Sequence, residues 1–314
     1  METLRPSAPR VTVLLPVYEA ERFLGEAVES ILAQTLRDFE LLALDDGSRD
    51  GSAALLDRYA SLDPRVRVVR RPHTGVVATL NAGLALARGE LIARMDADDV
   101  ALPRRLQCQL ARLDREPALV CIGGGFEVID DAGRTLDRVF PACDHAAILS
   151  RALGGESPIS HSAATYRRDA VLALGGYDES SRLVEDLDLW LRLAEVGTLA
   201  NVPDLVSRVR HHERSLSERN AAAQLEQARR VAERACRRRG IVTSQVRPRA
   251  WRALPDRCSR QLVALGRARA AWRIGERRTA LLYGLRAFCM QPFSVPVWRS
   301  VGHELKASLL RSRT

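Results

Sequence analysis

Three polar clusters, each placed directly after a short apolar run, carry side chains that could do chemistry on a phosphate. They are Pro16-Val17-Tyr18-Glu19, Asp45-Asp46-Gly47-Ser48 and Asp96-Ala97-Asp98-Asp99. Carboxylate and phosphate oxygens are the ligands that Mg²⁺ and Mn²⁺ prefer, and these ions commonly join one or two protein carboxylates to substrate phosphates. A cation held by these clusters would neutralise the charge that builds on a departing diphosphate.

The spacing of Asp96 and Asp98 is the first sign that the third cluster binds a metal. On an extended backbone, residues two apart project to the same side, so both carboxylates could reach one ion. A single D-x-D in a chain with 39 acidic residues is more often solvated loop charge, and Asp45-Asp46-Gly47-Ser48 alone is more often a turn with a helix cap. The order of the clusters, and the strand expected before each, favour the functional interpretation.

A second acidic pair, Glu185-Asp186, opens a helix whose apolar residues Leu187, Trp190 and Leu191 share one face. In the first turn the helix dipole favours an ionised carboxylate by about 0.3–1 kcal/mol. A general base must be ionised to accept a proton, so Asp186 is a candidate base. The alternative is that the pair only caps the helix. Trp190 is expected to pack in the core and not to serve as a stacking surface for a ligand.

Alternating strands and helices must position these clusters. Apolar, β-branched runs predict strands over 11–17, 39–44, 65–69 and 91–95, and helical spacing predicts helices over 23–32, 52–60 and 76–87. Short connections of this kind indicate an α/β fold with a mostly parallel sheet covered on both faces. Ligands bind at the carboxyl ends of such strands, where the three clusters would converge. Further along, we expect a hairpin turn at 131–133 and a last strand over 205–210.

The charge of the chain is divided unevenly. Residues 1–218 carry 26 basic and 34 acidic residues, whereas residues 219–314 carry 22 basic and 5 acidic, a net charge of +17. Helices are expected in this basic extension over 220–239, 260–273 and 279–290. The extension could be a solvated helical face, a surface that docks on anionic lipid, or a site for a partner or nucleic acid. Apolar side chains that could add to lipid docking are Leu262, Leu265, Trp272, Leu281, Leu282 and Phe288.

The composition of the chain indicates the cellular compartment in which the protein is expected. The polar residues 1–10 lack the apolar core of a signal peptide, and no apolar run reaches the length of a spanning helix. None of the six cysteines forms a C-x-x-C pair, so reduced thiols are expected. We therefore expect a cytoplasmic protein, with any membrane attachment being peripheral on the inner face. The expected domains are a flexible segment 1–10, an α/β domain 11–218 and the basic helical extension 219–314.

Taken together, residues 11 to about 217 resemble a family 2 glycosyltransferase with the GT-A fold. The matching stretches are VTVLLPVYEAERFLGEAVESILAQT, FELLALDDGSRDGS, GVVATLNAGLALARGELIARMDADD, GGYDESSRLVEDLDLWLRL and RVRHHERSLS. They occur in the order of the family and cover about two-thirds of the chain. The resemblance implies transfer of a sugar from a nucleoside-diphosphate donor, linked to UDP, dTDP or GDP, to a glycan or lipid-linked acceptor in polysaccharide or glycolipid assembly.

The resemblance also assigns roles by position. Pro16, Val17, Tyr18, Glu19 and Asp46 would hold the base and ribose. Asp96 and Asp98 match the D-x-D that meets ribose, diphosphate and metal, with Asp99 and Glu185 as accessory groups, and Asp186 matches the base. Arg210 and His212 would reach phosphate or metal, and surface histidines are the alternative for His212; His161 would line the acceptor side or serve in the core. The sequence departs from the family at Glu19, where Asn is frequent, and at Leu80, where many members have Arg.

The reaction expected is an inverting transfer. The acceptor hydroxyl, deprotonated by Asp186, would attack the anomeric carbon in line with the diphosphate, while Mn²⁺ or Mg²⁺ held near Asp98 stabilises the leaving group. One base suffices because no covalent sugar intermediate is needed, as in inverting glycosidases. The rival hypothesis is a binding protein for nucleotides or nucleic acid, with an inactive GT-A fold and a basic tail. The tail lacks interleaved aromatic residues, and the acidic clusters are complete, so we favour the enzyme.

Overall fold

The computed structural model describes residues 8–212, 221–242 and 260–290, which form parts of two compact units. The first unit is Met1–Phe126 with Val139–Arg252, and the second is Glu127–Arg138 with Ala253–Thr314. This division differs from the boundary expected at residue 218, because helix α9 (Ala221–Arg238) packs on helices of the first unit. The segments 1–7, 213–220, 243–259 and 291–314 lie outside the described residues, and the structure therefore says nothing of the expected flexible N-terminus before residue 8.

Four parallel strands form one half of the sheet in the order β3-β2-β1-β4. All four were expected from the sequence, and they are β1 (Val11–Val17), β2 (Phe39–Asp45), β3 (Val66–Arg70) and β4 (Leu91–Arg94). Both faces of the central strands are buried. In β1, for example, Val13 and Leu15 belong to one apolar cluster and Leu14 to the other. The α/β prediction is confirmed.

The other half of the sheet is antiparallel where β8 pairs with β4 and β6, and where β5 pairs with β9. Its strands are β5 (Val100–Ala101), β6 (Leu119–Ile129), β7 (Thr135–Val139), β8 (Thr165–Arg167) and β9 (Thr198–Arg210). The whole sheet is therefore mixed. The hairpin turn expected at 131–133 joins β6 to its partner β7. Strand β9 begins before residue 205, where we expected it to begin. The prediction missed its first half because the exposed Pro203-Asp204 inside the strand resembles a loop in the sequence.

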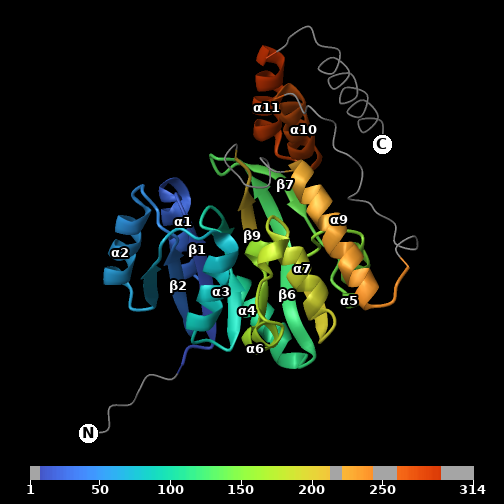
Figure 1. Cartoon of the computed structure of the whole chain (residues 1–314). Helices are drawn as coiled ribbons and strands as arrows, with labels where there is room; N and C mark the ends of the chain where they lie inside the picture. Colours follow the sequence, from blue (N-terminus) through green and yellow to red (C-terminus); the bar gives the residue numbers. More distant parts are fainter. Residues whose placement is uncertain (1–7, 213–220, 243–259, 291–314) are drawn as a thin grey trace. The chain divides into compact units, whose positions relative to one another are not determined.

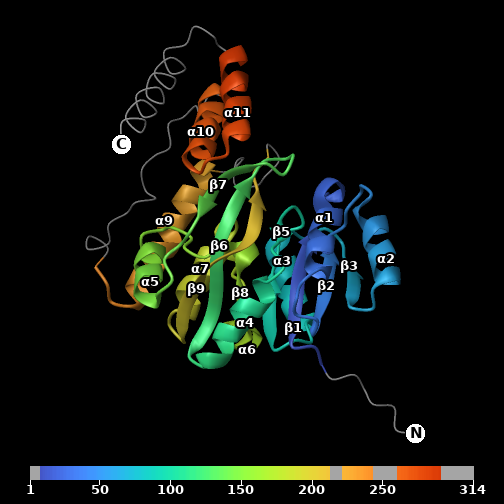
Figure 2. The same cartoon turned by 180° about the vertical axis from the view of Figure 1, so that it is seen from behind.

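Helices cover both faces of the sheet (Figures 1 and 2). One face is covered by α1 (Glu21–Leu32), α2 (Ser52–Leu62) and α4 (Arg105–Arg115). The other is covered by α3 (Val76–Leu86), α5 (His145–Leu153), α6 (Arg168–Ala173) and α7 (Glu185–Leu193). Helix α7 begins at Glu185 as expected, and Trp190 is fully buried in the core.

The described part of the second unit is a hairpin of two helices, both expected from the sequence, with a strand hairpin. Helices α10 (Arg260–Arg273) and α11 (Arg277–Met290) pack against each other. Their core contains Leu265, Tyr283 and Ala287, and the Tyr283 hydroxyl donates to Asp130 at 3.0 Å. Among the described residues, no helix is long and apolar enough to span a membrane. The five described cysteines are free, and Cys258 lies outside that part of the chain.

Candidate active site

The three polar clusters follow neighbouring strands of the parallel half-sheet. Tyr18 follows β1, Asp46 follows β2 and Asp96 comes two residues after β4, and β1 lies between β2 and β4. Backbone hydrogen bonds continue past the strand ends, from Asp46 N to Val17 O at 2.8 Å and from Met95 N to Leu14 O at 3.1 Å. The expected convergence at the carboxyl edge of the sheet is thus present.

Asp96, Asp98 and Asp99 form a compact acidic group, with one carboxylate oxygen from each residue within 4.8 Å of the others. The prediction of an extended backbone over these residues is wrong, because the chain turns after Asp96. Across this turn, Asp99 N donates a hydrogen bond to Asp96 O at 3.4 Å. Burial raises the pKa of Asp96 and raises that of Asp99 well above its usual value, and the carboxylate of Asp98 adds to both shifts. An all-oxygen group whose charges repel one another fits a hard divalent cation, which would relieve that repulsion.

Arg210, the last residue of β9, holds this acidic turn in place by hydrogen bonds. Arg210 N donates to Asp99 Oδ1 at 2.7 Å, and Arg210 Nε donates to Asp98 O at 2.8 Å. The Arg210 guanidinium also pairs with Glu26 and lies 4.5 Å from the centre of the Phe23 ring. His212 Nε2 lies 3.0 Å from Asp98 Oδ2, so this histidine is placed beside the expected metal ligand.

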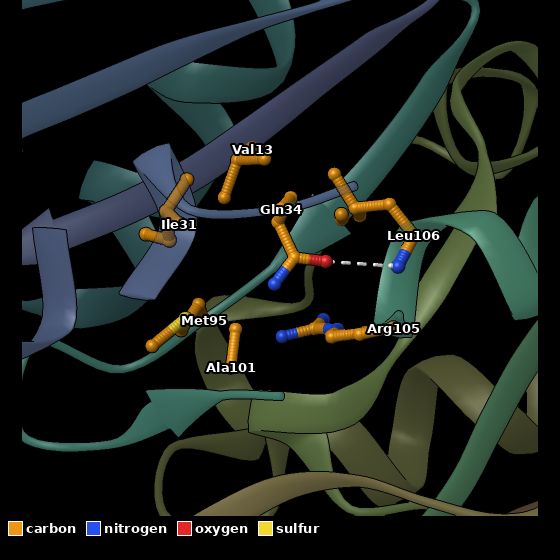
Figure 3. Close-up of a pocket in the computed structure, with 8 residues that line it drawn as sticks. Val13, Ile31, Gln34, Met95, Ala101, Arg105 and Leu106 are labelled. Atoms are coloured by element: carbon orange, nitrogen blue, oxygen red, sulfur yellow. Dashed lines mark hydrogen bonds between the residues drawn. The ribbon is translucent and has the colours of Figure 1, made fainter. Parts of the chain in front are cut away.

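Closely packed side chains support the segments that flank the turn Asp96–Asp99. Figure 3 shows the residues that line a small gap, among them Gln34, Arg105 and several apolar side chains. The gap has no room for a water molecule. Gln34 accepts from Leu106 N at 3.1 Å and donates to Leu102 O at 2.8 Å. The buried Arg105 donates to the carbonyl oxygens of Arg94 and Ser162. These bonds hold the segments on either side of Asp96–Asp99 in fixed positions.

Asp46 organises the neighbouring loop. Its carboxylate accepts from Thr74 N at 2.9 Å and Gly75 N at 2.8 Å, directly before α3, and His73 Nδ1 lies 2.9 Å from Asp46 Oδ2. Burial opposes ionisation, but these hydrogen bonds outweigh it and hold the pKa of Asp46 below its usual value. The His73 ring stacks on Tyr18, with centroids 4.1 Å apart. Tyr18 is exposed and presents a planar surface at the edge of the sheet.

Glu185 and Asp186 stand at the start of α7. Ser157 Oγ donates to Asp186 Oδ2 at 2.6 Å. Burial nevertheless raises the pKa of Asp186, so burial outweighs the helix dipole that we expected to favour the ionised form. Burial and the neighbouring Asp186 raise the pKa of Glu185 to about 7, and Glu185 Oε2 is buried without a hydrogen-bond partner. Two residues earlier, Leu183 has a φ of 77°, a strained conformation typical of functional loops.

The raised pKa of Glu185 predicts a pH-dependent cost in stability. The folded protein disfavours the ionised form, so the free energy of unfolding falls as the pH rises from 4.5, the ordinary pKa, to about 7. Glu185→Gln removes this cost, and we expect it to stabilise the protein by about 2 kcal/mol at pH 8 and by much less near pH 4.5. Thermal unfolding at the two pH values measures the difference. Glu179→Gln, at an exposed site, is the control; equal melting temperatures for Glu185→Gln and wild type at pH 8 would contradict the prediction.

A buried arginine pairs with Asp96, and three aromatic side chains form a hydrogen-bonded network. Arg94 is buried and pairs with Asp96. His161 Nε2 lies 2.9 Å from the Tyr177 hydroxyl, which bonds to the Tyr166 hydroxyl at 2.9 Å. Burial, with the charge of Arg94, lowers the pKa of His161 well below its usual value. His161 is therefore neutral at pH 7 and part of a packed network.

Of the other residues expected at the site, some are buried in the core and one is exposed. The Val17 side chain is in the core, so only its backbone could face a ligand, and Pro16 is half-buried in β1. Glu19 is exposed with a φ of 51°, and accepts from Arg49 N at 2.7 Å. Asn adopts this left-handed conformation more readily than Glu, so the Asn expected from the resemblance would fit this position with less strain. Leu80 lies on the buried face of α3 and is fully buried.

Four further residues were not expected from the sequence. They are His73 against Tyr18, Ser157 on Asp186, Arg94 on Asp96, and Arg182 near the start of α3. Arg182 is exposed, and a Cβ added at Gly75 would lie 3.9 Å from its Nη2. Only Arg94 had a usable signal, since it precedes Asp96 by two residues in Arg94-Met95-Asp96. The others depend on contacts between segments far apart in the chain.

Comparisons with known proteins identify the family of the chain. The family model described as Glycosyl transferase family 2 matches residues 12–175. The EpsE protein of Bacillus subtilis (strain 168) is 33% identical over 237 residues, which cover 74% of this chain and 84% of EpsE. The amylovoran biosynthesis glycosyltransferase AmsE of Erwinia amylovora is 31% identical, over 63% of this chain and 75% of AmsE. The chain belongs to glycosyltransferase family 2.

Solved structures confirm the GT-A fold. S. aureus TarS 1–349 in complex with UDP-GlcNAc superposes with a TM-score of 0.55 and 17% identity, over 83% of this chain and 79% of TarS. The mannosyltransferase PcManGT from Pyrobaculum calidifontis, in complex with GDP-Man and Mn²⁺, gives a TM-score of 0.56 and 19% identity, over 97% of this chain and 81% of that one. At these identities the likeness concerns the fold alone.

Proposed function

We propose that this protein is a metal-dependent, inverting glycosyltransferase that moves one sugar from a nucleoside-diphosphate donor to a hydroxyl of a glycan or lipid-linked acceptor. The observation that carries the proposal is the meeting of two acidic groups at one edge of the sheet. Asp96, Asp98 and Asp99 form one group, and Asp186 is close enough to Asp96 for their charges to interact. The relative AmsE, which is named for amylovoran biosynthesis, supports a glycan as the product.

The base and ribose of the donor would bind at the ends of β1 and β2. The exposed Tyr18 ring, held by His73, offers a stacking surface for a planar base. Asp46 is anchored by its contacts to Thr74 and Gly75, so it mainly fixes the loop that borders this surface. Arg182 supplies an exposed cation beside this loop and would contact the diphosphate, a role that the buried Leu80 cannot have.

Asp96 and Asp98 would hold Mn²⁺ or Mg²⁺, with Asp99 and His212 beside them. The bound ion supplies the positive charge that stabilises a nucleoside-diphosphate leaving group. Arg210 already donates to the Asp98 carbonyl and pairs with Glu26. We therefore assign it to positioning Asp98 and Asp99, and not to direct contact with phosphate.

Asp186 would act as the base. Its Oδ2 accepts a hydrogen bond from Ser157, which orients the carboxylate, and its raised pKa makes it a stronger acceptor of protons than an ordinary aspartate. The acceptor oxygen forms a bond to the anomeric carbon while the bond from that carbon to the diphosphate oxygen breaks. The hydroxyl proton passes to Asp186, and the electron pair of the broken bond leaves with the diphosphate.

The stereochemistry of the product tests this proposal. The full chain is incubated with Mn²⁺ and with α-linked UDP-, dTDP- and GDP-sugars, and donor consumption is followed by proton NMR. With one base and no covalent intermediate, the first sugar product, on an acceptor or released to water, has the β configuration. An α product at the earliest time points would contradict the inverting mechanism.

A further inference from the structure

Helix α11 presents an apolar face to solvent although its other face is already packed. Leu281 is 65% exposed, Leu285 53% and Phe288 42%. Their spacing of four and three residues places them on one side of the helix. The opposite side buries Ala280, Tyr283 and Ala287. A helix that is apolar on both sides has a second surface to cover.

The exposed apolar side chains are concentrated in the helix hairpin. Among the described residues, six of the thirteen large exposed apolar side chains lie in α10 and α11. Trp272, at the end of α10, is one of them, and the Arg277 guanidinium lies 4.0 Å from the centre of its ring. Leu265 is buried in the core of the hairpin and Leu282 is half-buried, so neither is one of these exposed side chains, and the Leu262 side chain is outside the described residues. Exposed apolar side chains that share one face of a helix, as Leu281, Leu285 and Phe288 do, are typical of a contact surface.

Arginines border this apolar face. Arg277 and Arg278 lie one turn before Leu281 and are exposed, and Arg286 is exposed one residue after Leu285. Residues 260–290 contain seven arginines and one acidic residue, Glu276. Glu276 lies 3.5 Å from Arg138, so it pairs away from the apolar side chains. The face therefore combines apolar side chains with the positive charge of the exposed Arg277 and Arg278.

We propose that the α11 face, defined as Trp272, Arg277, Arg278, Leu281, Leu285 and Phe288, docks on an anionic membrane surface. A second copy of the chain fits less well, because a twofold contact between identical faces would bring their arginines together. Anionic headgroups attract clustered arginines, and a shallow apolar stripe with a tryptophan suits the boundary between headgroups and acyl chains. Docking would bring the enzyme to the surface where lipid-linked acceptors are located.

Vesicle co-sedimentation of the full chain tests the docking. We expect the protein to pellet with vesicles of phosphatidylcholine and phosphatidylglycerol at low salt, to stay in solution with phosphatidylcholine alone, and to be released by roughly 0.5 M salt. Each arginine near an anionic surface contributes about fivefold to binding, so Arg277→Gln with Arg278→Gln should weaken it about 30-fold. Leu281→Gln with Leu285→Gln should weaken it more than about tenfold.

Matched variants separate this surface from general effects of charge and polarity. Arg58→Gln with Arg115→Gln makes the same charge change at exposed sites on α2 and α4, and Leu62→Gln with Leu172→Gln makes the same polarity change at exposed leucines. Both controls should bind vesicles as wild type does. The proposal is overturned if wild type ignores anionic vesicles at low salt, if the controls lose binding equally, or if sedimentation velocity shows a dimer that only the α11 variants dissociate. Nucleoside-diphosphate binding is measured separately, so a failed membrane test leaves the proposed reaction intact.

Discussion

Asp186→Asn is expected to bind the donor nearly as well as wild type and to lose sugar transfer by about 10²–10⁴-fold. Asparagine keeps the size of the side chain and can still bond to Ser157, but it cannot accept the acceptor proton. The loss therefore falls on the transition state and not on ground-state binding. Donor consumption at saturating substrate measures the rate, and calorimetry of the nucleoside diphosphate measures the affinity.

Two further variants make the result specific. Asp169→Asn changes an exposed aspartate at the start of α6 and should leave the rate unchanged. Ser157→Ala removes the hydrogen bond that orients Asp186 and should slow transfer by less than Asp186→Asn does. Turnover of Asp186→Asn within a few-fold of wild type would show that another group is the base.

Asp98→Asn is expected to weaken Mn²⁺-dependent binding of nucleoside diphosphates by at least about 100-fold while leaving the fold intact. The variant removes one negative charge from the group Asp96, Asp98 and Asp99, and amides bind hard divalent cations less well than carboxylates. Calorimetry of UDP and GDP, with Mn²⁺ and with a chelator, gives the metal-dependent affinity, and circular dichroism checks the fold.

The His212 contact to Asp98 could complicate this experiment, so His212→Ala serves as a companion variant. If His212 only holds Asp98 in place, at 3.0 Å, its removal should reduce metal-dependent affinity less than the loss of the carboxylate. Metal-dependent affinity of Asp98→Asn equal to that of wild type would remove Asp98 from the metal site.

The parallel half of the fold could be predicted from the sequence because its strands are short, apolar and bounded by polar turns. Most residues of the runs that become β1 and β2 are apolar, because both faces of a covered sheet are buried. The antiparallel half could not be predicted in the same detail. Strand β8 has three residues, and β9 is interrupted by the exposed residues Pro203 and Asp204, so neither has a readable period.

The carboxylates of the candidate site could be predicted because each follows a strand or opens a helix. Their surroundings could not. The contacts of Ser157 with Asp186 and of Arg210 with Asp98 join residues 29 and 112 positions apart. The helix dipole at Asp186 was visible in the sequence, whereas the burial that outweighs it depends on the whole fold.

The central claim, binding of a nucleoside-diphosphate donor with a divalent metal, is tested most directly by thermal unfolding of the full chain against a panel of nucleoside diphosphates and sugar nucleotides. A ligand that binds the folded state stabilises it by about 2.7 kcal/mol at 100 times its Kd. We predict that at least one member of the panel raises the melting temperature in Mn²⁺ and that a chelator abolishes the rise. No rise with any nucleotide in Mn²⁺, or an equal rise with the chelator, would contradict the account.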